Sequence, residues 1–334
     1  MKTTRQIYCR YLLSSQIKST CTNLADHVDT LDHNSIYRYL KNEKLTPPLV
    51  WEKARQTIVQ TTDGYILFDD TAADKSYSHD MAGVRRQYSG NAGGIVKGMR
   101  ILACVYYNAR ADRFWVIDYR IFDPDRDGKP KLDHVSEMLD SIERRRILFG
   151  SVLMDSWYAT TDLMRRLIKA DKLFYRLIKR NRLVDESGGQ EPYRVIEPLK
   201  WTAAEEQMGK TVKLRGFAGA THLKLFRVVV STSRRESIVT DDLTQSNTEA
   251  AHEASGHRWK IEQFHREAKQ TTGLERCQCR LNRSQRNHIA TAMPVWLCVK
   301  EPADKSRKTV YQLKQGLLSS YLKQQMRNPT IAFT

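Results

Sequence analysis

Two short runs, Tyr65-Ile66-Leu67-Phe68-Asp69-Asp70 and Ser151-Val152-Leu153-Met154-Asp155, decide the fold, because each is an apolar stretch that ends in aspartate. Apolar runs of this length without alternation predict strands that are covered on both faces, as in the sheet of an α/β protein. A lone aspartate after a strand is more often a turn or helix-cap residue. At the carboxyl edge of one sheet, however, Asp69 and Asp155 would repel each other unless a hard cation lay between them. Oxygen ligands alone favour Mg²⁺ or Mn²⁺ over zinc.

The segments around these runs predict an α/β layer. Strand signals at 99–107 and 114–121 and a helical pattern at 132–148 separate the two runs. A helix at 162–170 and a strand at 173–178 follow the second run. The order of three strands, a helix and a further strand is typical of a mixed sheet with helices on its faces.

The remainder of the chain divides into parts of different pattern. Glycines and prolines separate short β-prone pieces such as 223–230, which predicts a β-rich insertion. Helical patterns run from 248 to about 270 and from 284 to 299. The expected parts are a helical, helix-turn-helix-like module at 1–48, the first part of the α/β domain at 49–179, the insertion at 180–247, and a helical part at 248–334.

The N-terminal module contains two predicted helices joined by a tight turn. Apolar residues are spaced for a first helix over 24–31, and Asn34 or Ser35 could cap the second helix. The second helix would present Tyr37 and Arg38 outward, as a helix that enters a DNA groove does. A small bundle that packs on its neighbour would have the same pattern, so both interpretations stay open.

Composition indicates the kind of partner. The chain has 334 residues with 55 Lys and Arg against 38 Asp and Glu, a formal net charge of +17. Such an excess predicts binding to a polyanion, and nucleic acid is the first partner to consider. No apolar run approaches the roughly 20 residues of a membrane helix, and no signal-peptide pattern opens the sequence. We therefore expect a cytoplasmic, nucleoid-associated protein without a membrane partner.

Two other kinds of site are disfavoured by spacing. The six cysteines are scattered, which indicates free thiols in a reducing compartment. A zinc site of Cys277, Cys279 and His288 is a minor alternative, because the spacing matches no standard zinc motif. The glycine-rich loop at 90–94 lacks the Gly-Lys-Ser/Thr ending of a phosphate-binding loop, so no nucleotide cofactor is expected.

The long helical pattern from 248 offers a third acid. At about 100° per residue, Arg258, Glu262, His265 and Lys269 fall on one stripe of the helix, beside an apolar stripe. Glu262 therefore lies at the border of the buried face, whereas Glu267 falls off the stripe and is the weaker candidate. A solvated helix face would carry the same charges, so spacing alone leaves both interpretations open.

The order of strand-Asp, strand-Asp, β-rich insertion and helix-Glu resembles the RNase H-like catalytic core of the DDE transposases and retroviral integrases. Within this group, the sequence is similar to bacterial insertion-sequence transposases with a Tyr-x2-Arg-x3-Glu-x6-Lys signature. Arg258, Glu262 and Lys269 keep its spacing, whereas Ser255 stands at the Tyr position.

The two aspartate runs resemble the first and second acidic motifs of that family. In the first motif, the catalytic Asp is followed, after one intervening residue, by Thr or Ser. The sequence Asp69-Asp70-Thr71 therefore selects Asp69, with Asp70 as the alternate. The second motif corresponds to 154–158.

The resemblance implies metal-dependent phosphoryl transfer on DNA. Asp69, Asp155 and Glu262 would hold two Mg²⁺ (or Mn²⁺) ions roughly 4 Å apart. One ion would activate water or a 3′-hydroxyl, and the other would stabilise the leaving oxygen. The same site could thus cleave a strand at the end of the element and then join the freed 3′ end to target DNA.

The resemblance also implies DNA contacts along the helix. Arg258 and Lys269 would bind backbone phosphates, and His265 on the same stripe is grouped with them. Ser255 keeps the hydroxyl of the Tyr position but loses the ring. Trp157 or Trp259 could stack on an extruded base, although packing in the core is the more frequent role of such a residue.

Three functions remain open. The leading one is a transposase that recognises terminal inverted repeats with its N-terminal helices and self-associates to bring two DNA ends together. The second is a DNA-binding regulator whose transposase-like core is inactive. The third is a metal-dependent nuclease without strand transfer.

Overall fold

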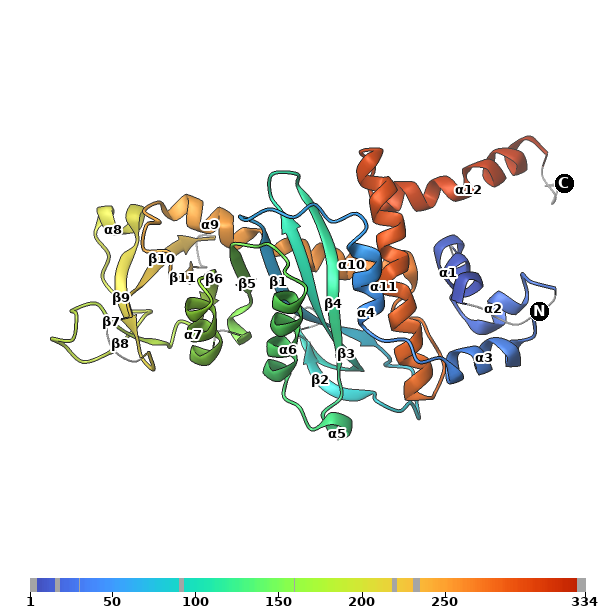
Figure 1. Ribbon diagram of the computed structural model, residues 1–334, viewed down its shortest axis with the longest axis horizontal. Coiled ribbons are helices and arrows are strands. Elements are labelled where there is room, and N and C mark those ends of the chain that lie inside the picture. The colour runs from blue at the N-terminus through green and yellow to red at the C-terminus, as the bar shows by residue number, and fades with distance from the viewer. Residues whose placement is uncertain are drawn as a thin grey trace.

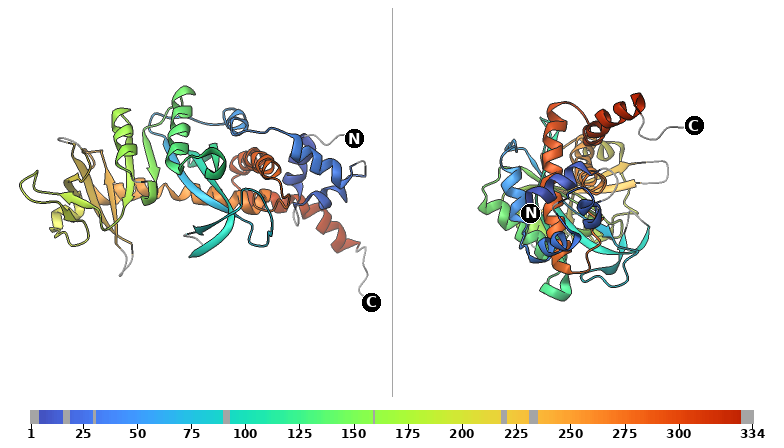
Figure 2. Two further views of the ribbon diagram at one scale, coloured as in Figure 1. Left: turned by 90° about the horizontal axis from the view of Figure 1, so that it is seen from below. Right: turned by 90° about the vertical axis from the view of Figure 1, so that its right-hand side faces the viewer.

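The molecule is elongated, with the N-terminal helices at one end and the β-rich insertion at the other (Figures 1 and 2). Between them lies a sheet with helices on both faces. None of the described helices combines the length and the apolar character that crossing a membrane requires. The computed structural model describes residues 5–15, 19–29, 31–89, 93–158, 160–217, 221–230 and 235–328. Residues 90–92 of the glycine-rich loop lie outside these ranges.

Strand β1 (Tyr65–Asp74), which contains the first aspartate run, is the centre of the sheet. It pairs antiparallel with β3 (Gly94–Asn108) on one side and parallel with β5 (Ser151–Met154) on the other. The other central strands are β2 (Arg85–Ser89) and β4 (Arg113–Phe122), both antiparallel to β3, and β6 (Leu173–Ile178), parallel to β5. The order β4-β3-β1-β5-β6 confirms the predicted RNase H-like mixed sheet.

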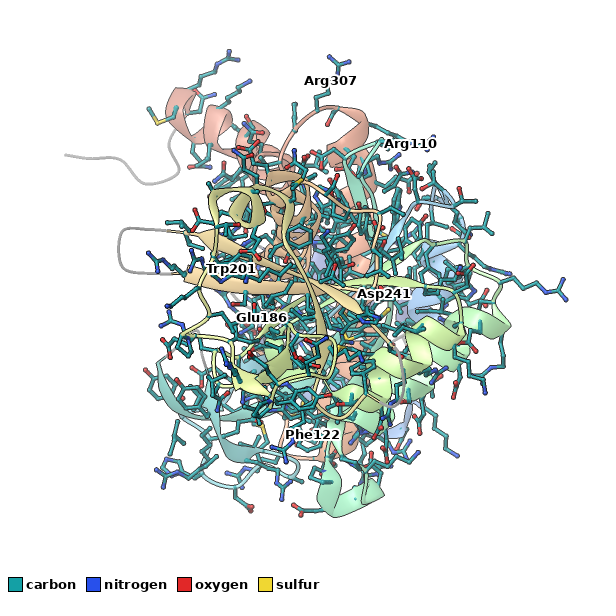
Figure 3. All side chains as sticks on the ribbon, turned by 90° about the vertical axis from the view of Figure 1, so that its left-hand side faces the viewer. Arg110, Phe122, Glu186, Trp201, Asp241 and Arg307 are labelled. Carbon is teal, nitrogen blue, oxygen red and sulfur yellow. The ribbon has the colours of Figure 1, made fainter. Side chains whose placement is uncertain are left out.

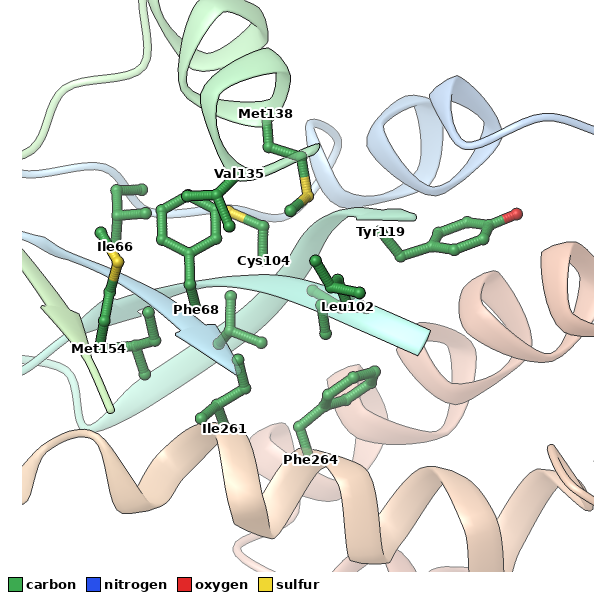
Figure 4. Close-up of a cluster of buried hydrophobic side chains, with 14 of the residues drawn as sticks. Ile66, Phe68, Leu102, Cys104, Tyr119, Val135, Met138, Met154, Ile261 and Phe264 are labelled. Carbon is green, nitrogen blue, oxygen red and sulfur yellow. The ribbon is translucent and has the colours of Figure 1, made fainter. Parts of the chain in front are cut away.

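Helices cover both faces of this sheet, which explains why its strands are apolar without alternation (Figure 4). On one face, α6 (Lys131–Arg144) places Val135 and Met138 near Phe68 of β1. On the other face, α10 (Trp259–Thr272) contributes Ile261 and Phe264. All five side chains are fully buried. Burial of each stabilises the fold by roughly 1.5–3 kcal/mol.

The predicted β-rich insertion is present and continues the central sheet. Strand β11 (Arg235–Thr240) pairs antiparallel with β6, and β10 (Leu223–Val229) pairs with β11. The remaining elements are β7 (Leu183–Asp185), β8 (Arg194–Val195), α8 (Ala203–Met208) and β9 (Lys210–Leu214). Together with α7 (Thr161–Lys169), they form the left part of Figure 1.

The N-terminal helices pack on the long helix α11 (Asn282–Lys305). Two helices at the chain ends, which the sequence analysis did not identify individually, also contact this helix: α1 (Arg5–Ser14) and α12 (Val310–Arg327). The other helices of this end are α2 (Cys21–Ala25) and α3 (His33–Asn42). Helix α4 (Pro48–Ala54) lies against β4 and α11, and α5 (Pro124–Asp127) lies below the sheet in Figure 1. The N-terminal helices therefore pack on a neighbour, and DNA recognition by α3 stays a prediction.

Two boundaries in this module differ from the prediction. Helix α3 is capped by Asp32 and not by Asn34 or Ser35, because the Asp32 carboxylate accepts a hydrogen bond of 2.6 Å from the Ser35 N–H. The helix that forms in place of the first predicted one is α2, which ends at Ala25, so Val28 and Leu31 are not helical.

The long helical pattern from 248 is also interrupted. Helix α9 (Thr248–Gly256) ends in a turn at His257–Arg258 before α10 begins. Gly256 is a weak helix former because it has no Cβ. The ring centroid of His257 lies 5.0 Å from the ring centroids of both Tyr65 and Tyr107. This contact fixes the start of α10 against β1 and β3.

His288 links α1 to the end of α10, which predicts that acid weakens the fold. Its Nδ1 lies 2.8 Å from the Tyr8 hydroxyl and its Nε2 lies 2.9 Å from the Gly273 carbonyl. Burial lowers the His288 pKa from 6.5 to about 4. The unfolded chain therefore takes up a proton that the folded chain rejects, so stability present above pH 6.5 is lost as the pH falls toward 4.

We expect the free energy of unfolding to fall by about 2 kcal/mol more in the unaltered protein than in His288→Gln between pH 7 and about 4.5. Urea unfolding at the two pH values measures this difference. Parallel pH dependences in the two proteins would show that His288 does not contribute.

Candidate active site

Asp69 and Asp155 lie side by side because of the register between β1 and β5. The last pair of this parallel ladder is Phe68 with Met154, and the two aspartates are the next residues on their strands. One detail of the prediction was wrong: Asp69 is not at the end of its strand. Strand β1 continues to Asp74, because β3 pairs with it along its full length.

Strand alternation sends Asp69 and Asp70 to opposite faces of the sheet. Asp70 forms ion pairs with Arg100 at 2.8 Å and with Lys131 of α6 at 2.5 Å. Asp69 faces α10, where its Oδ2 lies 3.9 Å from Nδ1 of His265. Asp70 is therefore neutralised by two cations, and Asp69 is not.

Asp69 has an unusually high pKa for a carboxyl group, about 7. Burial is the main cause, followed by the negative charge of Asp70; Glu262 also raises the pKa, and Arg258 lowers it. Negative charge is thus costly at this position without a counter-ion. A divalent cation with oxygen ligands would remove that cost, so the donor set fits Mg²⁺ or Mn²⁺.

Asp155 begins the turn after β5. Its Oδ1 accepts a hydrogen bond of 2.5 Å from the Ser156 N–H, at the start of the short 3₁₀ helix η1 (Ser156–Tyr158). The fully buried guanidinium of Arg176 on β6 holds this turn by donating to the Tyr158 carbonyl at 2.5 Å. The geometry of the Asp155 turn therefore depends on a residue of the neighbouring strand.

Glu262 lies on α10, on the side of the sheet that Asp69 faces. Its Oε1 accepts a hydrogen bond of 2.8 Å from Arg258, and its side chain is 26% exposed. Within the described ranges, no three His, Cys, Asp or Glu side chains are gathered closely enough to hold a metal ion. The three acids thus share one region, but Glu262 is turned toward Arg258.

Glu267, the weaker candidate, is part of the helix packing. It is buried, and its carboxylate accepts hydrogen bonds from Gln263 at 2.7 Å and from the Trp296 indole of α11 at 3.2 Å. Its role in holding α10 against α11 explains why it does not reach the aspartates.

The residues expected to bind DNA along α9 and α10 lie in different surroundings. Lys269 donates to the Ala72 carbonyl of β1 at 2.6 Å and pairs with Glu275 at 3.2 Å. Ser255 is buried near the end of α9. His265 is buried beside Asp69, and burial lowers its pKa to about 3, so a neutral ring stands at this position.

The candidates on α3 also differ from each other. Arg38 is exposed, and it donates to the Ser35 hydroxyl at 3.2 Å. Tyr37 is half-buried, and its hydroxyl accepts a hydrogen bond of 3.4 Å from the Arg280 N–H. Of the two side chains, only Arg38 is fully presented to a partner.

Both candidate stacking residues are exposed, although packing is the commoner role. Trp157 is 50% exposed and has Nζ of Lys131 4.7 Å from its ring centroid. Trp259 is 62% exposed, with the Arg258 guanidinium 5.3 Å from its ring. Each aromatic ring thus lies next to a cation at the edge of the acidic region.

Two further residues of this region, Tyr158 and Arg176, were not predicted as functional. The Tyr158 hydroxyl is buried, finds no hydrogen-bond partner among the described residues, and has a pKa well above its usual value because of burial and the charges of Asp70, Asp69 and Asp155. Arg176 stands out as the one charged residue in the apolar strand β6, and that was a signal that could have found it. Nothing in the sequence around Tyr158 indicates where its hydroxyl lies.

The zinc alternative is not supported by the position of His288. Both of its ring nitrogens are engaged, one with Tyr8 and one with the Gly273 carbonyl. Cys277 and Cys279 are buried free thiols, and the sulfur of Cys279 lies 4.0 Å from that of Cys21.

Comparison with known proteins assigns this region to a family. The model of the family described as "Transposase DDE domain" matches residues 69–298, which include Asp69, Asp155 and Glu262. No curated protein matches the sequence. Among solved structures, the chain is similar to the Drosophila P element transposase strand transfer complex, with 10% identity and a TM-score of 0.27. The similarity covers 50% of this chain and 35% of that chain, so it spans about a third of the relative's length.

Proposed function

This chain belongs to the transposase DDE domain family, and we propose that it cleaves DNA at the ends of a bacterial insertion sequence and joins the freed 3′ ends to target DNA. The observation that carries the proposal is the β1–β5 register, which brings Asp69 next to Asp155 on the side where α10 carries Glu262. Two aspartates far apart in the sequence are thus neighbours on adjacent parallel strands.

We assign the binding of divalent cations to Asp69, Asp155 and Glu262. When bound, Mg²⁺ or Mn²⁺ would supply an activated water or 3′-hydroxyl and would neutralise charge on the leaving oxygen. The chain's own contribution is to hold the carboxylates: β1 and β5 fix the two aspartates, and Arg176 fixes the turn of Asp155. Glu262 would have to leave Arg258 to join them.

Arg258 is the residue best placed to couple DNA binding to this change. A backbone phosphate offers its guanidinium an alternative to the Glu262 carboxylate. Phosphate binding by Arg258 would therefore release Glu262 toward the aspartates. Lys269 and Ser255 are proposed to bind the DNA further along α10 and α9, with Trp157 and Trp259 available for stacking.

DNA recognition and catalysis would be carried out by different parts of the chain. Residues 1–48 would recognise the terminal inverted repeats through α3, with Arg38 as the exposed contact. Residues 49–179 and 248–334 would form the catalytic domain around the insertion at 180–247. Two copies would associate on DNA to bring both ends of the element together.

A second candidate is a DNA-binding regulator with an inactive core. The ion pair between Arg258 and Glu262 favours it, because this pair keeps one acid away from the other two. In that case the chain would bind the same DNA ends but would not cut them.

Incubation of the purified protein with DNA carrying the element's ends and Mg²⁺ or Mn²⁺ tests the proposal. We expect nicks with 3′-hydroxyl ends at the element boundary, joined products when target DNA is added, and neither product in excess chelator. Binding without nicks would identify the regulator, and nicks without joined products would identify a nuclease.

A further inference from the structure

A groove on the sheet face opposite to α10 concentrates positive charge. It has a volume of about 890 Å³ and lies over the end of β4, between α4 with its preceding linker, α6, and the first turn of α11. Eight Lys or Arg and four Asp or Glu side chains line it, an excess of four positive charges. We call it the β4 groove.

Buried carboxylates fix the arginines on the floor of the β4 groove. Asp118 of β4 is fully buried and pairs with Arg120 and with Arg145, the latter at 3.4 Å. Asp123 is buried and pairs with Arg286 of α11 at 2.9 Å. Because these guanidinium groups are already held in place, little side-chain entropy is lost when an anion binds them.

The rim of the β4 groove carries cations that are available to a ligand. Lys44, Arg126, Arg144 and Arg283 are all exposed. In the described part of the chain, the side chains of Lys44 and Arg126 form no hydrogen bond or ion pair. The groove thus has arginines held by carboxylates on its floor and exposed cations on its rim. This arrangement is suited to a ligand that carries several negative charges along its length.

The β4 groove lies on the same face of the sheet as the ion pairs of Asp70, opposite to the face on which Asp69 contacts α10. Lys129 lines the groove, and Lys131, two residues later, pairs with Asp70 at 2.5 Å. Strand β4 is two strands away from β1, which is about 10 Å across the sheet. The groove is therefore close to the acidic site but on the other face of the sheet, so a ligand in it makes contacts of its own.

We infer that the β4 groove binds the sugar-phosphate backbone of double-stranded DNA, as a contact separate from the one at the acidic site. The ligand class rests on the proposed function, because that proposal makes DNA the substrate. The groove adds affinity through phosphate contacts and does not take part in the chemistry.

Salt-dependent DNA binding by the full chain tests this inference. The groove variant Lys44→Gln/Arg126→Gln/Arg144→Gln removes three rim cations. We expect it to lower the slope of log K against log salt by about 2 to 3 and to weaken binding roughly ten- to a hundredfold near 0.15 M salt. A fluorescently labelled duplex reports the affinity.

The matched control removes the same charges elsewhere, with Arg110→Gln/Lys305→Gln/Arg307→Gln. Figure 3 shows Arg110 and Arg307 at the top of the molecule, whereas Phe122, the end of β4, lies at the bottom. We expect this control to change the salt slope by less than about 1. Equal losses in both variants, or none in either, would overturn the inference.

Chemical acetylation of the unaltered protein gives a test that needs no variant. Bound duplex should protect Lys44 at the β4 groove and leave Lys305 reactive. Equal reactivity of Lys44 with and without DNA would overturn the inference. The proposed function fails separately, by the absence of metal-dependent cleavage in the unaltered chain.

Discussion

The Asp69→Asn variant is expected to lose metal-dependent cleavage by at least about 10³-fold while it still folds and binds DNA. Asparagine has nearly the shape of aspartate but lacks the charge that attracts a divalent cation. Because burial raises the pKa of Asp69 to about 7, its negative charge costs free energy in the absence of metal. Asp69→Asn should therefore be at least as stable as the unaltered protein above pH 7, as urea unfolding would show.

Asp70→Asn is the matched control at the neighbouring position. It leaves Arg100 and Lys131 without the carboxylate that they share. All three side chains of these two ion pairs are less than 15% exposed. We expect a loss of roughly 2–4 kcal/mol in the free energy of unfolding, with much of the cleavage by folded protein retained. The opposite result, in which Asp70→Asn alone stops cleavage, would exchange the roles of the two residues.

Glu262→Gln and Glu267→Gln form a second pair with opposite expected effects. Glu262→Gln should reduce cleavage by at least about 10³-fold, since it removes the third carboxylate. Its effect on stability should be below about 1 kcal/mol, because the Arg258–Glu262 pair is partly exposed. Single-turnover cleavage and urea unfolding measure the two effects.

Glu267→Gln should destabilise the protein by roughly 1–2 kcal/mol and leave the cleavage rate of the folded protein nearly unchanged. The buried Glu267 carboxylate joins Gln263 to Trp296, and the amide can replace only part of this arrangement. If Glu267→Gln stopped cleavage and Glu262→Gln did not, the third acid would be Glu267.

Local sequence patterns predicted the positions of the central strands β5 and β6 correctly. Strands β5 and β6 have the predicted bounds, because short apolar runs between polar turns have few alternative structures. The expected adjacency of Asp69 and Asp155 is observed, although it results from the parallel register of β1 and β5 and not from both strands ending there. In contrast, the continuation of β1 to Asp74 depends on pairing with β3, which local patterns do not contain.

Long-range contacts account for the other differences. The insertion was expected to be β-rich. That it continues the central sheet was not predicted, because this depends on pairing between β11 and β6, which are more than 50 residues apart. Helix α10 begins where it does because His257 packs on two tyrosines from distant strands. The sequence indicated that Glu262 borders the buried face, yet its pairing with Arg258 depends on side-chain conformation.

The most direct test is the anomalous diffraction of Mn²⁺ in crystals of the protein bound to DNA that carries an element end. We expect Mn²⁺ about 2 to 2.5 Å from carboxylate oxygens of Asp69, Asp155 and Glu262, with Glu262 released from Arg258. Mn²⁺ bound without one of these three acids, or a Glu262 still paired with Arg258 in the DNA complex, would contradict it.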